Sequence, residues 1–294
     1  MNHIHPAATG IKPATENGQI LLGLIGEGIG PSRTPRMQME EGQAQGLKIR
    51  YDLFDLTAMK LTLADLSRLV ADIEAAGYAG VNVTHPCKQA IIPLLHDLSP
   101  DARALGAVNT VLFQNGKRIG HNTDWSGFSE SFRRRLQGAD MAHAVQIGAG
   151  GAGSAVAYAL LKLGTVRLTL IDADISRAEA LAARYAPLFP AATIAAATAP
   201  ETPLQSATGL VNCTPMGMAA HPGLPLPASL LRPDLWVAEI VYFPLETELV
   251  KTARALGCQV SDGGGMAVFQ AVAAFRLFTG HEPDAERMLA SFGA

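Results

Sequence analysis

Residues 142–164, AHAVQIGAGGAGSAVAYALLKLG, decide the fold of this chain. The apolar run 142–147 predicts a buried strand, and the small and apolar residues after the glycines predict a helix. Gly148, Gly150 and Gly153 form the pattern G-x-G-x-x-G, with Gly151 as an additional glycine. The first glycine permits a tight turn, the second lets the backbone approach a pyrophosphate, and the third lets the helix pack against the strand. This strand–turn–helix therefore predicts a dinucleotide site, with phosphates at the helix N-terminus.

Asp172 ends the next apolar segment, VRLTLID, residues 166–172. An acid at this place hydrogen-bonds the ribose hydroxyls of the adenosine. It also repels a 2′-phosphate, by about 3 kcal/mol for unit charges ~5 Å apart at an effective dielectric constant of ~20. These arguments favour NAD over NADP. Arg177 keeps NADP possible, because an arginine can receive that phosphate; it could instead pair with Asp172, stack on adenine or be solvated.

Strands alternate with helices along the whole chain, which predicts an α/β protein with mostly parallel sheets covered on both faces. Expected strands before the glycine-rich turn are 19–26, 48–55 and 78–84, and expected helices are 35–46, 61–77, 88–95 and the connecting segment 123–138. After it we expect strands 191–199, 209–214, 235–242 and 257–263, and helices 175–189, 265–280 and 283–293.

Composition excludes several classes of protein. The 294 residues are 48% hydrophobic and 17% charged with a net charge of −3, so they favour neither nucleic acid nor an anionic membrane surface as a partner. No stretch approaches the ~20 apolar residues of a membrane helix. The three cysteines form no CxxC pair, which argues against a metal site and for a reducing compartment. We expect a soluble cytoplasmic protein without a metal.

The first half of the chain offers polar groups for a hydroxylated substrate. Lys88 follows an expected strand end, Asn109 stands where a strand should begin, and Asp124 lies in GHNTDWSGF. SRTP places Thr34 at an expected helix N-cap with Pro35 at N1, so Ser32 and Thr34 would present hydroxyls to a carboxylate. A capping threonine beside an ordinary loop serine is the alternative.

Eight blocks appear in one order: GPSRTPRMQ, NVTHPCKQA, LGAVNTV, GHNTDWSGF, IGAGGAGSAVAYAL, NCTPMGM, VYFPLETEL and DGGGMAVFQAVAAFRLFTG. From about residue 20 to 290 they resemble the shikimate dehydrogenase family, and in detail its NAD-preferring quinate/shikimate branch. The resemblance implies an N-terminal α/β substrate domain at 20–121, completed by about 266–294. It implies a Rossmann-like NAD(P)-binding domain at 122–265. Residues 1–19 are expected to be a mobile tail.

The resemblance also implies site residues. Lys88 and Asp124 would be the catalytic pair. Ser32 and Thr34 would bind the substrate carboxylate, Thr84, Asn109 and Gln270 the ring hydroxyls, and Asn82 would shape that pocket. Tyr242 is expected to line the substrate site near the nicotinamide, with a core tyrosine as the alternative. The implied cofactor contacts, beside the turn glycines Gly148 and Gly153, are Gly150, Gly151, Asp172, Arg177, Thr214, Met216, Val241 and Gly263.

The reaction implied by the resemblance is reversible NAD-linked oxidation of the 3-hydroxyl of shikimate and quinate. Thr34 supports quinate, because a threonine there accompanies acceptance of quinate in that branch. Three alternatives stay open: an NADP-linked biosynthetic shikimate dehydrogenase, a silent sensor of shikimate-like ligands, and a folate-type dehydrogenase, which would leave SRTP and GHNTD unexplained. Monomer and homodimer are both compatible with the family.

Two points are left open by the sequence. A lysine in water has a pKa of about 10.4, and a base must lose that proton, so either Lys88 or Asp124 could be the base. Cys87 stands where the family usually has a bulky aromatic residue, and we interpret it as a packing residue rather than a nucleophile. His85, two positions earlier, is interpreted as structural or at the rim of the pocket.

Overall fold

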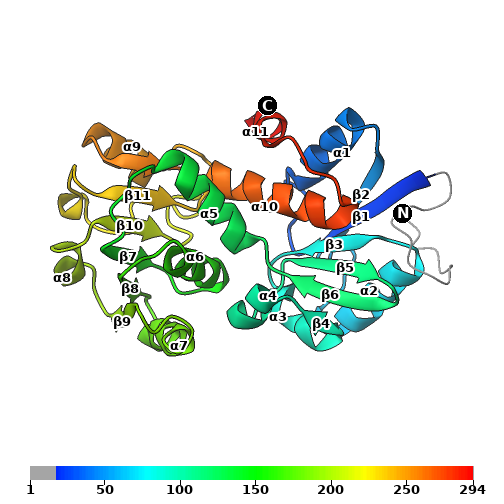
Figure 1. Ribbon diagram of the computed structural model, residues 1–294, viewed down its shortest axis with the longest axis horizontal. Helices are drawn as coiled ribbons and strands as arrows, with labels where there is room; N and C mark the ends of the chain where they lie inside the picture. The colour runs from blue at the N-terminus through cyan, green and yellow to red at the C-terminus, as the bar shows by residue number, and fades with distance from the viewer. Residues whose placement is uncertain (1–17, 294) are drawn as a thin grey trace. The chain divides into compact units, whose positions relative to one another are not determined.

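A computed structural model describes residues 18–293, so the predicted tail 1–19 lies almost wholly outside the described residues. The chain forms two compact units (Figure 1). The first runs up to Thr123 and resumes at Gln270; the second is Asp124–Phe269. The predicted α/β fold class with two domains is confirmed, including the return of the C-terminal helices to the first. No helix within residues 18–293 is long and apolar enough to cross a membrane.

The first unit is built on a six-stranded sheet of order β2-β1-β3-β5-β6-β4. Its strands are β1 (Gln19–Gly26), β2 (Lys48–Asp55), β3 (Gly80–Val83), β4 (Asp97–Leu98), β5 (Thr110–Gln114) and β6 (Lys117–His121). β1 pairs in parallel with β2 and β3, which are joined to it through helices as βαβ units require. The three strands predicted in this half of the chain are confirmed.

The β5–β6 hairpin was not predicted. β5 pairs antiparallel with β3 and with β6, and its turn consists of Asn115 (φ 53°) and Gly116 (φ 70°). Two successive residues with positive φ define the tight hairpin turn for which Asn-Gly is the preferred sequence. The dipeptide at 115–116 was therefore a signal for this hairpin.

Helices cover both faces of the first sheet. They are α1 (Thr34–Ala44), α2 (Leu66–Ala75), α3 (Cys87–Ala90), α4 (Pro100–Leu105), part of α10 (Gly263–Thr279) and α11 (Ala285–Gly293), with 3-10 turns at Leu63–Asp65 and Ile92–Leu94. Alternate residues of β1 enter different cores, as the two-residue period of a strand requires. Leu21 and Ile25 pack with Ile73 of α2, whereas Leu22 packs with Phe278 of α10.

The start of α1 differs from the prediction by one residue. The structure places Arg33 at the N-cap and Thr34 inside the first turn, so Thr34 is not the cap. Ser32 takes over part of that role, because its Oγ accepts the N–H of Thr34 at 3.3 Å. Both hydroxyl residues still stand at the beginning of the helix.

The second unit contains a parallel six-stranded sheet of order β12-β11-β10-β7-β8-β9. Its strands are β7 (His143–Ile147), β8 (Arg167–Ile171), β9 (Thr193–Ala197), β10 (Gly209–Asn212), β11 (Trp236–Glu239) and β12 (Gln259–Ser261). The first strand of the unit lies in the middle, and the chain proceeds outward on one side before returning to the other. This is the strand order of the Rossmann fold, whose ligand crevice lies where the order reverses, here between β7 and β10.

The helices of the second unit are α5 (Asp124–Arg135), α6 (Gly151–Lys162), α7 (Ile175–Tyr185), α8 (Glu201–Leu204) and α9 (Glu248–Ala255), with the beginning of α10. A 3-10 turn at Ala228–Leu230 precedes β11. Val145, Leu210 and Val237 of three adjacent strands form one core with Leu249 of α9. Neither α8 nor α9 was predicted, although Thr247 is the N-cap of α9 and accepts the N–H of Val250 at 3.2 Å.

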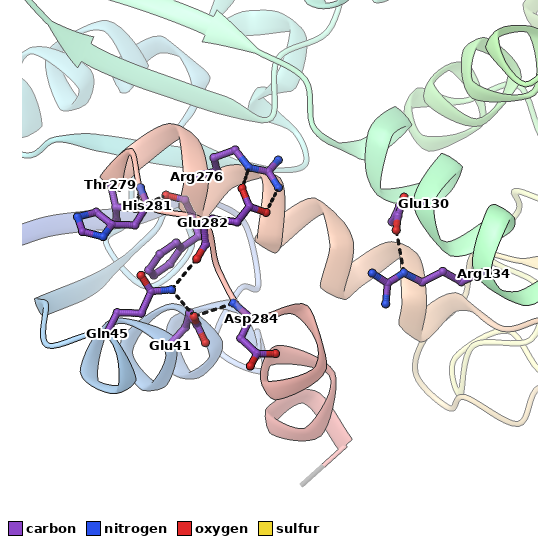
Figure 2. A network of polar contacts seen from close by, with 10 residues as sticks. Glu41, Gln45, Glu130, Arg134, Arg276, Thr279, His281, Glu282 and Asp284 are labelled. Carbon is purple, nitrogen blue, oxygen red and sulfur yellow. Dashed lines mark hydrogen bonds and ion pairs between the residues drawn. The ribbon is translucent and has the colours of Figure 1, made fainter.

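α11 is fastened to α1 by a buried carboxylate (Figure 2). Glu41 of α1 has a fully buried side chain and accepts hydrogen bonds from Arg287 at 2.6 and 3.1 Å. It also accepts the N–H of Asp284 at 2.9 Å and Gln45 Nε2 at 2.6 Å. Burial acts to raise the pKa of Glu41, but the bonds from Arg287, Asp284 and Gln45 outweigh it and the pKa is lowered. The ionised carboxylate is therefore the stable form.

We expect Glu41→Gln to lower the free energy of unfolding by about 2 kcal/mol at neutral pH, because charge-assisted hydrogen bonds to a buried carboxylate are lost. A carboxyl with a lowered pKa stabilises above its unfolded value of 4.5 and loses that contribution as the pH falls through the folded value. The difference between native protein and variant should then shrink below pH 4.5, as followed by urea unfolding. Glu282→Gln, which breaks an exposed pair with Arg276 in the same region, is the control and should change little. Equal effects of the two substitutions would contradict this account.

Candidate active site

The substrate-side residues predicted from the first unit gather at one edge of its sheet. The carboxyl ends of β1, β2 and β3 meet there, and β5 begins beside the end of β3 because the two run antiparallel, with Asn82 opposite Thr110. Ser32 and Thr34 come after β1, and Thr84 and Lys88 come after β3. Asn82 lies near the end of β3, and Asn109 immediately precedes β5. In open α/β sheets this edge is where ligands bind.

Asn82 and Asn109 belong to one buried polar network. Asn82 Nδ2 donates to the backbone oxygen of Asn109 at 3.3 Å and to Thr110 Oγ1 at 3.1 Å, and its Oδ1 accepts from Tyr51 at 2.8 Å. Asn109 Oδ1 accepts the N–H of Thr123 at 2.7 Å, while its Nδ2 donates to Thr123 Oγ1 at 2.9 Å. These side chains are held in fixed orientations, which a site for a small hydroxylated molecule requires.

Lys88 is positioned by the backbone of a short helix. It is half-buried in α3, and its backbone oxygen accepts the N–H of Val108 at 2.9 Å, which joins α3 to the segment that carries Asn109. Cys87 beside it is fully buried in the core of the first unit, and burial raises the pKa of its thiol to about 11. The thiol is therefore protonated at neutral pH, in keeping with its interpretation as a packing residue.

Asp55 was missed by the sequence analysis and organises the loop that carries Ser32. Its carboxylate, at the end of β2, accepts the N–H of Ile29 at 2.9 Å and of Gly28 at 3.2 Å. Burial acts to raise the pKa of Asp55, but backbone hydrogen bonds, led by that of Ile29, outweigh it and the pKa is lowered. An acid directly after a parallel strand was the available signal, since that strand end lies at the same edge as the predicted site.

The glycine-rich turn has the geometry that its sequence predicts. Gly148 has a φ of 100°, in the region that favours glycine. A Cβ on Gly153 would lie 2.2 Å from the backbone oxygen of Gly148, so a side chain is excluded where α6 crosses the turn. Gly150 and Gly151, in contrast, face open space at the N-terminus of α6. The first N–H groups of a helix have no acceptor within the helix, and together with this open space they fit a pyrophosphate.

The carboxylate of Asp172 is hydrogen-bonded to the glycine-rich turn. Its Oδ2 accepts the N–H of Ala149 at 2.8 Å and its Oδ1 accepts that of Asp174 at 3.0 Å. Arg177 does not pair with Asp172 in this structure; its ion pair, at 3.7 Å, is with Asp174, and both side chains are mostly exposed. Such a pair contributes little energy, so Arg177 can exchange partners easily.

The remaining predicted cofactor residues follow the three strands on the other side of β7. Asn212 at the end of β10 shapes the turn with Thr214 and Met216: its Oδ1 accepts Thr214 Oγ1 at 2.7 Å, and its Nδ2 donates to the backbone oxygen of Met216 at 2.9 Å. Val241 follows β11, and a Cβ on Gly263 at the start of α10 would lie 2.3 Å from its backbone oxygen. Asn212 was not among the site residues predicted from the sequence.

The other predicted site residues lie in α5, after β11 and in α10. Asp124 is buried at the first residue of α5, in the second unit, whereas Lys88 is in the first. Tyr242 is 51% exposed and is therefore not a core tyrosine. Gln270 lies half-buried in α10, at the first position assigned again to the first unit. Among residues 18–293, no cluster of three histidines, cysteines or acids is suited to hold a metal ion.

Comparisons with known proteins give one family. The chain matches the model of the shikimate dehydrogenase substrate binding domain over residues 24–111 and of the shikimate 5′-dehydrogenase C-terminal domain over residues 263–291. A shikimate dehydrogenase (NADP(+)) of Streptomyces avermitilis is 55% identical over 92% of this chain and 94% of its own. A quinate/shikimate dehydrogenase (NAD(+)) of Corynebacterium glutamicum is 49% identical over 94% of this chain and 99% of its own. The solved quinate dehydrogenase from Corynebacterium glutamicum in complex with NAD matches with a TM-score of 0.89 and 47% identity, over 93% of this chain and 98% of that chain.

We expect Asn109→Ala to destabilise the first unit, since it leaves the buried N–H of Thr123 and the hydroxyl of Thr110 without their acceptor. The loss should be about 2–3 kcal/mol in chemical denaturation, the cost of unsatisfied buried donors. Gln114→Ala, at the exposed end of the adjoining strand β5, should stay within about 0.5 kcal/mol of the native protein. Equal stability of the two variants would mean that the network does not hold this edge of the sheet.

Proposed function

The chain belongs to the shikimate dehydrogenase family, and from this premise we propose that it is an NAD-dependent oxidoreductase acting on shikimate and quinate. The reaction would oxidise the 3-hydroxyl to give 3-dehydroshikimate and 3-dehydroquinate, reversibly. The observation that carries the NAD assignment is the carboxylate of Asp172, fixed beside the glycine-rich turn by Ala149. A carboxylate there hydrogen-bonds free ribose hydroxyls and repels a 2′-phosphate.

We assign the substrate to the sheet edge of the first unit. Ser32 and Thr34 at the start of α1 would hold its carboxylate, with the N-terminal end of the helix favouring negative charge. Thr84, Asn109 and Gln270 would contact the ring hydroxyls, and Asn82 would keep Asn109 in place through the contact already described. Tyr242 would line the same site. The buried network explains how neutral groups can orient a polyhydroxylated ring.

We assign the proton to Lys88 and Asp124. Oxidation of an alcohol releases a hydride from carbon and a proton from oxygen, and bound NAD supplies the acceptor for the hydride. The hydroxyl proton would pass to the Lys88–Asp124 pair, which would return it in the reverse direction. Gly148, Gly150, Gly151 and Gly153 would hold the pyrophosphate.

A specific observation supports a second candidate. The relative that is 55% identical is a shikimate dehydrogenase (NADP(+)), and Arg177 has only a weak, exposed pair with Asp174. An arginine in that state can turn to a 2′-phosphate. The alternative is therefore an NADP-linked shikimate dehydrogenase in which Arg177 outweighs Asp172.

Initial rates with shikimate or quinate, each with NAD⁺ or NADP⁺, test the proposal directly. We expect turnover of both acids and at least tenfold higher kcat/KM with NAD⁺ than with NADP⁺, a difference of about 1.4 kcal/mol. Activity with NADP⁺ on shikimate alone would establish the second candidate. Absence of turnover in all four combinations, with binding retained, would make the chain a ligand sensor.

Asp172→Asn tests the cofactor argument by itself. Removing the charge should raise the ratio of kcat/KM with NADP⁺ to that with NAD⁺ by about 10- to 100-fold, because a repulsion of about 3 kcal/mol at most is relieved. Glu179→Gln removes the same charge from an exposed position of α7 and leaves the Arg177–Asp174 pair intact, so it is the matched control. A ratio that responds equally to both substitutions would show that Asp172 has no special role.

A further inference from the structure

Glu239 is a buried acid for which the proposed reaction has no use. It ends β11 and is 2% exposed. Its Oε1 accepts the N–H of Ile240 at 2.9 Å and of Val241 at 3.0 Å, and its Oε2 accepts Thr247 Oγ1 at 3.1 Å. Asn212 Nδ2 donates to both oxygens, at 2.9 and 3.1 Å. Every one of these partners is a donor, so the arrangement suits a carboxylate, which only accepts.

These bonds join two loops at the carboxyl edge of the second sheet. Through Asn212, Glu239 reaches the turn after β10, where Asn212 also binds Thr214 and the backbone oxygen of Met216. Thr214 Oγ1 in turn accepts the N–H of Met216 at 3.1 Å. The shape of that turn therefore depends on an asparagine whose own orientation is set by Glu239.

The second loop is fixed from the same carboxylate. Its bond to the N–H of Val241 sets the course of the chain after β11, and the backbone oxygen of Val241 is the atom that excludes a side chain from Gly263. Thr247 closes the loop at the other end as N-cap of α9. Displacement of Glu239 would thus move the loops after β10 and β11 and the start of α10 together.

We propose that Glu239 is a positioning residue that holds the contacts for the nicotinamide half of the cofactor. The inference rests on the proposed function, because it takes Thr214, Met216, Val241 and Gly263 as cofactor contacts. In the strand order of this sheet the adenosine half belongs to β7, β8 and β9, and the nicotinamide half to β10, β11 and β12. Glu239 therefore acts on one half of the dinucleotide site.

The proton state of Glu239 supplies a readout that a purely structural role lacks. Burial raises the pKa of Glu239 to about 7, against the opposing effect of its hydrogen bonds, of which those from Val241 and Asn212 are the largest. Protonation turns one acceptor oxygen into a donor, and of the partners only the hydroxyl of Thr247 can accept from it, so the bonds around the carboxyl must rearrange. Affinity for the nicotinamide half should then fall as the pH decreases through 7.

The stability of the fold should respond in the opposite direction. In the unfolded chain this carboxyl has a pKa of 4.5, below the folded value of about 7, so the folded state binds the extra proton between these values. Its contribution to stability is therefore largest at low pH and declines as the pH rises through 7. A general loosening of the protein would make binding and stability change in the same direction.

Glu239→Gln leaves in place the other titratable groups on the packed elements, among them His221 in the loop after β10, so loss of the pH dependence in that variant assigns it to Glu239. The thiol of Cys213 faces Glu239, and burial followed by the charge of Glu239 raises its pKa well above its usual value. Arg254 forms ion pairs with Glu246 and Asp262, and the side chains of Glu248 and Lys251 are exposed on α9. The titratable and charged groups on β10, β12, α9 and the loops after β10 and β11 include Cys213, His221, Tyr242, Glu246, Glu248, Lys251, Arg254, Cys258 and Asp262.

The experiment is calorimetric titration of the full chain with NAD⁺ and, separately, with ADP-ribose, from pH 6 to 8.5. ADP-ribose lacks the nicotinamide, and neither ligand carries the titrating 2′-phosphate of NADP⁺. The proteins are the native chain, Glu239→Gln and the control Glu248→Gln, which alters an exposed acid of α9. We expect the native affinity for NAD⁺ to rise about tenfold across this range, as for one charge-assisted hydrogen bond. Glu239→Gln should lack that rise and bind NAD⁺ about tenfold more weakly at pH 8.5, with ADP-ribose unaffected.

The outcomes separate this inference from the proposed function. If neither ligand binds the native chain, both are overturned. If NAD⁺ binds with the same affinity at every pH, or Glu239→Gln retains the native profile, only the role of Glu239 is overturned. Should Glu239→Gln fail to fold, the native chain alone decides: melting temperature and NAD⁺ affinity must change in opposite directions between pH 6 and 8.5.

Discussion

The approach of Gly153 to the backbone of Gly148 is the constraint on which the second unit depends. At 2.2 Å from a hypothetical Cβ, the oxygen of Gly148 admits no side chain, and Gly148 itself lies against the backbone of Cys213 at the end of β10. Three chain segments thus meet at the point where the strand order reverses. Because the turn is this tight, the N-terminus of α6 opens directly above the sheet, and the strands on both sides can present their loops to one extended ligand.

The two units solve a similar problem with different means. Each places its candidate site at the carboxyl ends of parallel strands. The first unit orients the amides and hydroxyls of its site by bonds among themselves, with Asp55 holding one loop, whereas in the second unit the carboxylates of Asp172 and Glu239 hold the loops by accepting from backbone amides. Neutral groups suit a ligand recognised by many hydroxyls. Carboxylates suit loops whose N–H groups must be held in place, since a single carboxylate can satisfy several buried donors at once.

Much of the framework could be predicted from the sequence because its signals are local. The strand 19–26, the glycine-rich turn and the acid that follows β8 are each marked by residue types at fixed positions in a short stretch of sequence. The hairpin at Asn115–Gly116 also has a local signal in its dipeptide, but the alternation of strands and helices along the chain predicts parallel pairs and not an antiparallel one. The one-residue difference at the start of α1 arises because Ser32, rather than Thr34, accepts the helix N–H.

The residues that support the site by hydrogen bonds could not be predicted from local sequence patterns. Each of them holds another segment by a hydrogen bond. Asp55 bonds to Ile29, 26 residues away; Asn212 bonds to Met216, 4 residues away; and Glu239 bonds to Thr247, 8 residues away. Their place at strand ends was a signal for an edge of the sheet but not for their partners, which are defined only once the strands are paired. Their roles follow from topology, which sequence patterns specify only in outline.

One continuous helix, α10, contributes to both units. Gly263 at its start packs against the backbone of Val241 in the second unit, and Phe278 near its end belongs to a core of the first. Neither the core beneath β1 nor the fastening of α1 by Arg287 can form from the first 123 residues alone. The first unit is therefore not a contiguous cassette. A ribosome must extend the chain past Phe278 before the first sheet can be covered on both faces, so the first unit is completed only after the second has been synthesised.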